Sequence, residues 1–237
     1  MIVFNPEAQI TALEVAPGRE VLLFDDALKN PEALVELACA QHHALRPSAH
    51  NAYPGIMFPL DETIRDRATE FFSSMARSRF GARRVLHANV RLAMVTSPPN
   101  QLQARQTIPH RDSQTLEAHE TIVASVLYLF HEVSLGGTSF FRAKRGELET
   151  RRLIHDSSTM DTAAFAAKHS IPTAYFKGSN DWFEHLATIP AKWNRLIFYD
   201  GGEFHSGSIE SPEDLSVDPA KGRLTLNGFF TCTRRAV

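Results

Sequence analysis

The spacing of hydrophobic residues changes about a third of the way along the chain, from a mostly helical period to a strand period. Before residue 84, a short apolar run at 21–24 predicts a strand, and apolar residues at helical spacing predict two helices. The first helix follows Asn30 and Pro31, which suit the N-cap and the first helical position. The second helix is expected over about residues 61–79. Its apolar face consists of Ile64, Ala68, Phe71, Phe72 and Met75.

From residue 84 onward the pattern is that of successive strands separated by turns rich in Gly or Pro. Because no helices alternate with these strands, the pattern indicates an antiparallel sandwich or barrel rather than a doubly wound sheet. The strand signal stops over residues 143–185, where 161–169 predicts a short helix and 178–183 an aromatic loop. An insertion of this size is a candidate lid. The expected strands lie at 85–95, 122–130, 138–142, 195–199 and 224–231.

We therefore expect a single domain over residues 1–237, mainly β with flanking helices (α+β). Residues 1–83 would supply a strand and supporting helices. Residues 84–237 would form the core, interrupted by the insertion at 143–185.

Composition and charge restrict the function classes. The chain is 43% hydrophobic and 22% charged with a net charge of −2, which is typical of a soluble globular protein and gives no electrostatic case for nucleic acid or an anionic membrane as partner. No apolar stretch approaches the roughly 20 residues needed to span a bilayer, and no secretory signal is visible, so the cytoplasm is the expected location. With two cysteines and 11 histidines, any metal must be held by imidazole and carboxylate groups.

His110 and Asp112 form the sharpest candidate for chemistry. In an extended segment, residues two apart point to the same side, so both side chains can bind one ion. A third ligand from another strand, such as His205 just after the expected strand at 195–199, would complete a triad of two histidines and one carboxylate. Such a triad leaves three coordination positions open on Fe(II).

Two strands carry polar stripes that need an explanation. Arg223, Thr225 and Asn227 share one face of the last strand, opposite the apolar face formed by Leu224, Leu226 and Phe230. Buried polar groups without partners are costly, so this stripe requires a cavity or a ligand. The second stripe, on the strand at 85–95, would line a substrate mouth or form a solvated face. It consists of His87, Asn89 and Arg91.

The order of these motifs resembles the Fe(II)/2-oxoglutarate-dependent oxygenases, especially their prolyl-4-hydroxylase-like branch. The resemblance covers roughly residues 86–233 and includes the runs VTSPP, QTIPHRDS, GGTSFFR and NRLIFYDGGEFHSG. Together these runs look like a bacterial family of that superfamily, and the resemblance implies no particular substrate. It does imply a double-stranded β-helix (jelly-roll) core with N-terminal helices.

The resemblance implies His110, Asp112 and His205 as catalytic iron ligands. It also implies that Arg223 pairs with the distal carboxylate of 2-oxoglutarate and that Tyr128 contacts the same group. Thr225 and Asn227 are further cosubstrate candidates, while Tyr128 could equally be a core tyrosine. Arg223 lies further beyond the distal histidine than is usual in the family. An enlarged loop at 210–221 accounts for the gap, and its last residue, Lys221, is the nearest competitor for the role of Arg223.

The expected activity is hydroxylation of a C–H bond in a peptide, an amino acid or a small metabolite, using Fe(II), O2 and 2-oxoglutarate and forming succinate and carbon dioxide. Two alternatives stay open: a cupin-like metalloenzyme or zinc hydrolase that does not use 2-oxoglutarate, and a non-catalytic jelly-roll binding module. The substrate, the oligomeric state and the role of the insertion at 143–185 are not predicted.

Overall fold

The computed structural model describes residues 1–47, 53–112, 116–117 and 119–234. Within these residues, every helix is too short or too polar to span a lipid bilayer. The four α-helices are α1 (Glu32–Ala40), α2 (Glu62–Met75), α3 (Glu147–Thr159) and α4 (Thr162–His169). The strands are β1 (Ile10–Ala16), β2 (Arg19–Phe24), β3 (Arg46–Pro47), β4 (Gly55–Pro59), β5 (Ala82–Val95), β6 (Glu120–Tyr128), β7 (Thr138–Ala143), β8 (Phe183–Ile189), β9 (Leu196–Asp200), β10 (Phe204–Gly207) and β11 (Arg223–Arg234).

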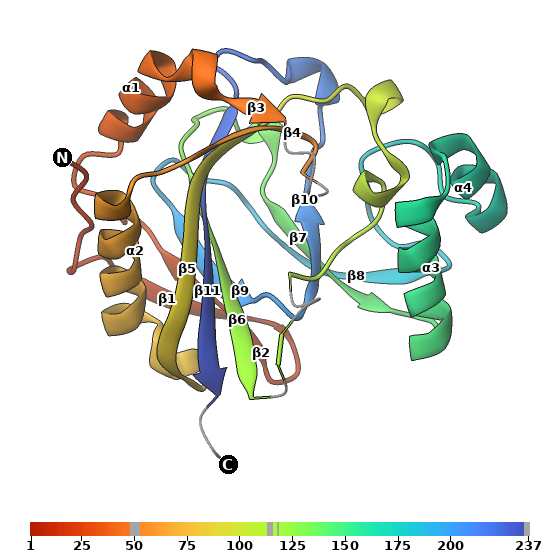
Figure 1. Ribbon diagram of the computed structural model, residues 1–237, viewed down its shortest axis with the longest axis horizontal. Coiled ribbons are helices and arrows are strands. Elements are labelled where there is room, and N and C mark those ends of the chain that lie inside the picture. The colour runs from red at the N-terminus through yellow and green to blue at the C-terminus, as the bar shows by residue number, and fades with distance from the viewer. Residues whose placement is uncertain (48–52, 113–115, 118, 235–237) are drawn as a thin grey trace.

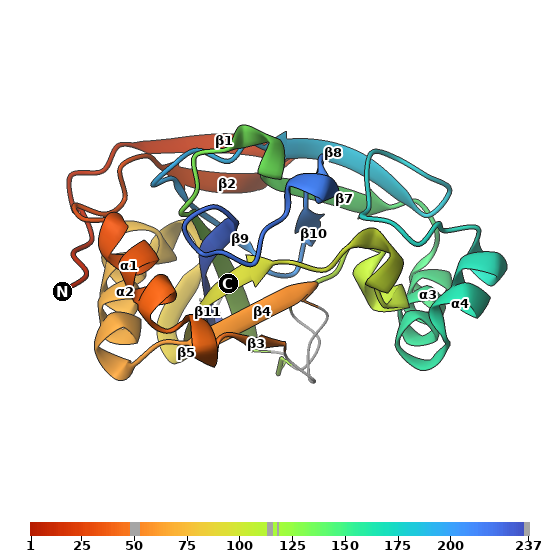
Figure 2. The same ribbon diagram turned by 90° about the horizontal axis from the view of Figure 1, so that it is seen from above.

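The strands form two antiparallel sheets. The larger sheet has eight strands in the order β1-β2-β9-β6-β11-β5-β4-β3, and the smaller has three in the order β10-β7-β8. Figures 1 and 2 show the two sheets between α1 and α2 on one side and α3 and α4 on the other. The prediction of a mainly β protein with antiparallel sheets is therefore confirmed.

Helices α1 and α2 cover one face of the larger sheet, which we call the outer face. The Asp61 side chain accepts a hydrogen bond from the Ile64 N–H at 3.0 Å and so caps the start of α2. The buried face of α2 contains the predicted Ile64, Ala68, Phe71 and Phe72, and the Phe72 ring stacks on Phe230 of β11 at 4.4 Å. Burial of these large apolar side chains supplies the main driving force for this layer.

The opposite, inner face of the larger sheet packs against the smaller sheet through the apolar cluster that includes Tyr128, Phe140, Ile197 and Tyr199. Alternation along β11 places Leu224, Leu226 and Phe230 in the outer-face core. The polar stripe predicted on β11 therefore lies on the inner face, between the two sheets.

The insertion at 143–185 is packed rather than extended. Helices α3 and α4 build their own apolar cluster, which also includes Ile108 and Phe204. Since these two residues stand close in sequence to His110 and His205, the insertion supports both segments that carry candidate ligands. The predicted helix at 161–169 matches α4, but α3 was not predicted. Its buried face contains the polar residues Thr150, Asp156 and Ser157 beside Leu153, which hides the hydrophobic period.

Two expectations for the N-terminal part are wrong. Residues 1–83 contribute strands β1 to β4 to the larger sheet rather than a single strand. The signal of β1 was missed because most of its side chains are exposed. Asn30 does not cap α1: Pro31 holds that position, and the Asn30 side chain accepts the Val3 N–H at 2.9 Å, which ties down the N-terminal segment.

Candidate metal centre

His110 and His205 lie on neighbouring segments that pair as a short antiparallel bridge. The His110 N–H donates to the His205 carbonyl at 3.0 Å, and the His205 N–H donates back to the His110 carbonyl at 2.9 Å. His205 belongs to β10, so the bridge extends the smaller sheet by one segment. The main chain thus brings together two histidines that are far apart in the sequence.

Asp112 is held close to both histidines by the turn after β9. Its N–H donates to the Gly201 carbonyl at 2.7 Å, and the Gly201 N–H donates to the Ile122 carbonyl at 3.0 Å. A Cβ at position 201 would come within 2.8 Å of the Ile122 side chain and 3.1 Å of the Asp112 Cβ. Glycine is therefore required there for Asp112 to approach.

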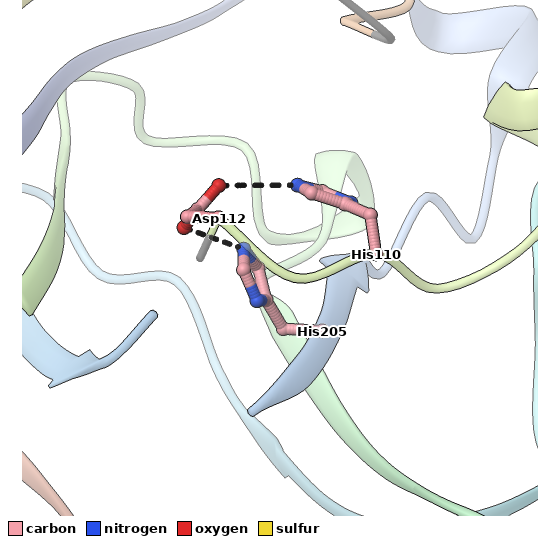
Figure 3. Close-up of side chains that lie close together, drawn as sticks. All are labelled: His110, Asp112 and His205. Atoms are coloured by element: carbon pink, nitrogen blue, oxygen red, sulfur yellow. Dashed lines mark ion pairs between the residues drawn. The ribbon is translucent and has the colours of Figure 1, made fainter. Parts of the chain in front are cut away.

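The three side chains point toward one another (Figure 3). The His110 Nε2 lies 3.7 Å from the Asp112 Oδ1, and the His205 Nε2 lies 3.4 Å from the Asp112 Oδ2. One ligand atom from each residue falls within 4.8 Å of the others, which is a spacing that one metal ion can bridge. The structure thus brings together the three residues that the sequence analysis named as ligands.

The protonation states of the triad suit a cation. Burial lowers the pKa of His205 to about 4. The pKa of His110 is also lowered to about 4, by partial desolvation of its ring against the protein and by the neighbouring His205, so both imidazoles are neutral near pH 7. The His205 Nδ1–H donates to the Glu203 carbonyl at 2.9 Å, which leaves the Nε2 lone pair directed at the site. Burial also raises the pKa of Asp112, a shift that a bound cation would oppose.

One edge of the triad is open. The His110 side chain is 45% exposed, whereas those of Asp112 and His205 are 11% and 6% exposed. The Asp112 Oδ2 is buried and accepts no hydrogen bond. Burying a carboxylate oxygen without a hydrogen-bond partner costs free energy unless a cation binds to it. The exposed side of His110 is the side from which a ligand can reach the site.

Arg223 is buried at the start of β11, with 4% of its surface exposed. Its Nε donates to the carbonyls of Leu135 at 2.9 Å and Gly136 at 3.2 Å, and its Nη2 donates to the carbonyl of Gly137 at 2.7 Å. The main chain thus occupies one edge of the guanidinium group. The competing cation, Lys221, has a side chain that is 78% exposed.

The remaining predicted residues lie near Arg223 on the inner face. The Tyr128 hydroxyl is hydrogen-bonded to the Thr138 hydroxyl at 2.8 Å, and the Thr225 hydroxyl donates to the Ala93 carbonyl at 3.2 Å. The Asn227 side chain is 8% exposed, and its Oδ1 is buried with no hydrogen-bond partner. Of the polar stripe on β11, Asn227 is therefore the residue with an unfilled hydrogen-bonding position.

Sequence reasoning named Tyr128 but not the other three tyrosines on which the charge of Arg223 acts. Burial raises the pKa of each of the four, and the positive charge of Arg223 acts against that rise in every case. They are all four tyrosines of the chain: Tyr53, Tyr128, Tyr175 and Tyr199. Tyr128 and Tyr199 lie on strands β6 and β9, whereas Tyr53 and Tyr175 lie in loops, where the strand period gives no signal.

A cavity of about 300 Å3 lies beside the triad rather than at it. The hairpin of β1 and β2 forms one wall, and Phe140 and Tyr199 form part of another. Both of these rings also contact the His205 ring, at 6.4 and 4.7 Å between centroids. None of the triad residues lines this cavity, so we do not assign the substrate to it.

A family model matches residues 6–230, almost the whole chain, and describes a family of unknown function, DUF6445. The chain belongs to the DUF6445 family. No functionally curated protein matches the sequence of this DUF6445 member.

Solved structures similar to this DUF6445 chain include 2-oxoglutarate-dependent enzymes at low sequence identity. The non-heme α-ketoglutarate-dependent carbocyclase SnoK from nogalamycin biosynthesis has a TM-score of 0.50 at 13% identity, covering 93% of this chain and 84% of SnoK. HygX from Streptomyces hygroscopicus, with nickel, 2-oxoglutarate and hygromycin B bound, has a TM-score of 0.49 at 11% identity over 92% of this chain and 84% of HygX. A Pseudomonas putida prolyl-4-hydroxylase has a TM-score of 0.44 at 12% identity over 97% of this chain and 95% of that enzyme. The SnoK likeness shows a shared fold.

Proposed function

We propose that this protein is an Fe(II)- and 2-oxoglutarate-dependent dioxygenase, built on a double-stranded β-helix core, that oxidises a C–H bond of an organic substrate. The observation that carries the proposal is the convergence of His110, Asp112 and His205 within 4.8 Å. The fold shared with SnoK, a 2-oxoglutarate-dependent enzyme, is consistent with it.

The residues present fit a divalent iron ion. Two neutral imidazole nitrogens and one carboxylate oxygen form the donor set typical of non-heme iron enzymes with open coordination positions. The buried Asp112 Oδ2 that lacks a hydrogen-bond partner is the observation that such an ion would explain. No cysteine competes in this donor set, which distinguishes it from structural zinc sites.

Iron and 2-oxoglutarate, when bound, supply the oxygen chemistry that forms succinate and carbon dioxide and oxidises the substrate. The chain itself positions the groups. The hydrogen bond from His205 Nδ1 to Glu203 orients the imidazole, and the bridge to His110 aligns the second ligand. Arg223 would pair with the distal carboxylate of 2-oxoglutarate through its remaining guanidinium edge, and Tyr128 and Thr225 would contribute hydroxyl groups to the same part of the site.

The occupied edge of Arg223 favours a second candidate, a metalloenzyme that uses the same triad without 2-oxoglutarate. In that case Arg223 would act only as a bond between β11 and the turn at 135–137. The two candidates differ in whether 2-oxoglutarate binds when a divalent metal is present.

The first experiment measures metal binding. Equilibrium dialysis with Mn(II) should show one bound ion for the wild-type protein, and Asp112→Asn and His205→Ala should each weaken binding by about 100-fold or more. His87→Ala, which removes an exposed histidine of β5, is the matched control and should bind like wild type. Equal binding by the wild type and Asp112→Asn would exclude the triad as the metal site.

The second experiment separates the candidates. In the absence of oxygen, Mn(II) should raise the melting temperature of the protein. Adding 2-oxoglutarate should raise the melting temperature further, because a ligand that binds only the folded state stabilises that state. With Fe(II) and oxygen, succinate should form in the wild type and not in His110→Ala. If Mn(II) raises the melting temperature and 2-oxoglutarate does not raise it further, the result would favour the metalloenzyme that does not use this cosubstrate.

A further inference from the structure

Arg91 is the second arginine on the inner face of the larger sheet. It stands on β5 directly opposite Asn227 of β11, two positions along the strand from Ala93, which pairs with Thr225. Its guanidinium lies 4.6 Å above the ring of Phe229. Stacking on an aromatic ring fixes the plane of the guanidinium and leaves its N–H edges available for a planar partner.

Arg91 forms no salt bridge with a described residue, and the carboxylate whose charge acts on it is that of Asp112 in the triad. The Arg91 Nε is buried and makes no hydrogen bond. The sequence at 48–52 and 113–115 contains no Asp or Glu. The facing Asn227 Oδ1 is likewise buried without a partner. Burying a cation and an amide oxygen without hydrogen-bond partners costs free energy, unless a bound ligand forms hydrogen bonds with both groups.

Arg91 lies on the same inner face of the larger sheet as the candidate metal centre. The Phe229 ring on which it stacks belongs to a residue that pairs with Ala124 of β6, and Ala124 pairs with Tyr199 of β9. The Tyr199 ring lies 4.7 Å from the His205 ring, so a single row of inner-facing residues connects Arg91 with the triad. The exposed side chain of His110 leaves the triad open to a substrate that Arg91 could hold.

We propose that Arg91 and Asn227 together anchor a substrate that carries a carboxylate next to an N–H or O–H donor. The inference rests on the proposed function and names the class of molecule that is oxidised, such as an amino acid, an N-acyl amino acid or a hydroxy acid. One unpaired guanidinium balances one negative charge, and its planar fork matches a carboxylate. The Asn227 Oδ1 requires a donor, which the adjacent N–H or O–H supplies.

The assignment to the substrate rather than to 2-oxoglutarate follows from position. Arg223 stands four residues along β11 from Asn227 and serves the distal carboxylate in the proposed function. The other end of 2-oxoglutarate is a 2-oxo acid that binds metal directly. The carboxylate held by Arg91 then belongs to a third molecule, the one oxidised at the metal.

The experiment uses N-acetylglycine as the probe and N-acetylglycinamide as its neutral counterpart, which keeps the N–H and loses the charge. The protein is loaded anaerobically with Mn(II) and saturating 2-oxoglutarate. Binding is followed by the paramagnetic broadening of the acetyl protons of the probe. In the wild type, N-acetylglycine should bind about tenfold more tightly than the amide. Arg91→Gln should abolish this preference, Arg91→Lys should keep part of it, and Asn227→Leu should weaken both probes.

Arg83→Gln is the control, since Arg83 is an exposed arginine on the same strand, and it should bind like wild type. Unaltered Mn(II) affinity in Arg91→Gln shows that the variant is folded. Equal affinity for the two probes in the wild type, or an unchanged preference in Arg91→Gln, would overturn the inference. Weakened 2-oxoglutarate binding in Arg91→Gln would also overturn it, because Arg91 would then hold the cosubstrate. A wild-type protein that binds neither Mn(II) nor 2-oxoglutarate would instead reject the proposed function, before any probe is added.

Discussion

Arg223 and Arg91 stand on neighbouring strands and both face the inside of the molecule, yet their surroundings differ. Arg223 donates to three main-chain carbonyls and is almost fully buried. Arg91 stacks on Phe229 and forms no hydrogen bond or ion pair with any described residue. A third arginine, Arg195, pairs with the carboxylate of Asp25 at 2.6 Å. The comparison indicates that Arg195 and Arg223 both stabilise the fold through hydrogen bonds, and that Arg223 keeps one guanidinium edge for the proposed cosubstrate. Arg91 has no such partner within the described part of the chain.

The largest expected effect comes from Arg223→Met. This change leaves the carbonyls of residues 135–137 without their donor in a buried place, so the free energy of unfolding should fall by about 4 kcal/mol. Urea denaturation measures the loss, and Arg223→Lys should lose less because it keeps the charge and a donor. A loss below about 1 kcal/mol would show that the main-chain contacts do not stabilise the fold.

Gly136→Ala tests the turn that supplies those carbonyls. Gly136 has a φ of +74°, and a Cβ there would come within 1.5 Å of the Ser208 carbonyl oxygen. The expected loss of unfolding free energy is about 3 kcal/mol, combining strain with displacement of the turn. Gly18→Ala is the matched control, because Gly18 has a φ of +71° with open space around its Cβ. If Gly136→Ala lowers the free energy of unfolding no more than Gly18→Ala does, the clash with the Ser208 carbonyl does not contribute to the loss.

The Asp25–Arg195 pair gives a smaller effect that depends on pH. The hydrogen bond from Arg195 lowers the pKa of Asp25 to about 2, below the value of about 3.9 expected in the unfolded chain. The pair therefore stabilises the protein above about pH 4, and this contribution disappears as the pH falls toward 2. Because the Asp25 side chain is 33% exposed, we expect about 1 kcal/mol. The difference in unfolding free energy between wild type and Asp25→Asn, measured from pH 7 to pH 2, should shrink toward zero.

Arg91→Met should have the smallest effect on stability. Unlike Arg223→Met, it should not lower the free energy of unfolding and could raise it. Removing an unpaired, partly buried cation also removes the free-energy cost of desolvating it. The methionine side chain is apolar and should keep most of the contact with Phe229. The free energy of unfolding should stay within about 1 kcal/mol of wild type or rise. A loss above about 2 kcal/mol would show that Arg91 stabilises the fold and would place it with Arg223.

The parts of the fold that follow local rules could be predicted from the sequence. The cap at Asp61 and the apolar face of α2 follow from helical spacing, and the alternation of β11 follows from the strand period. The spacing of His110 and Asp112 predicted one side of the candidate metal centre, because residues two apart in an extended segment share a side. In each of these cases a single short segment contains the whole signal.

What could not be predicted depends on pairing between distant segments. The period of β5 places Arg91 on one face of a strand but does not tell whether that face is solvated or covered. Only the register of β5 against β11, with Arg91 opposite Asn227, decides this. Helix α3 was hidden because Asp156, on its buried side, is satisfied by His169 at 2.8 Å. A tertiary hydrogen bond allowed a polar residue where the hydrophobic pattern requires an apolar one.

The bridge between His110 and His205 also has a consequence for the order of events during folding. The two imidazoles come together only when chain segments far apart in the sequence have closed into neighbouring positions, a contact that forms late when loop closure is slow. A metal ion that requires both histidines would therefore bind only after the surrounding structure has folded. It should slow the unfolding reaction while leaving the refolding rate almost unchanged, so that loading with metal extends the lifetime of the folded protein.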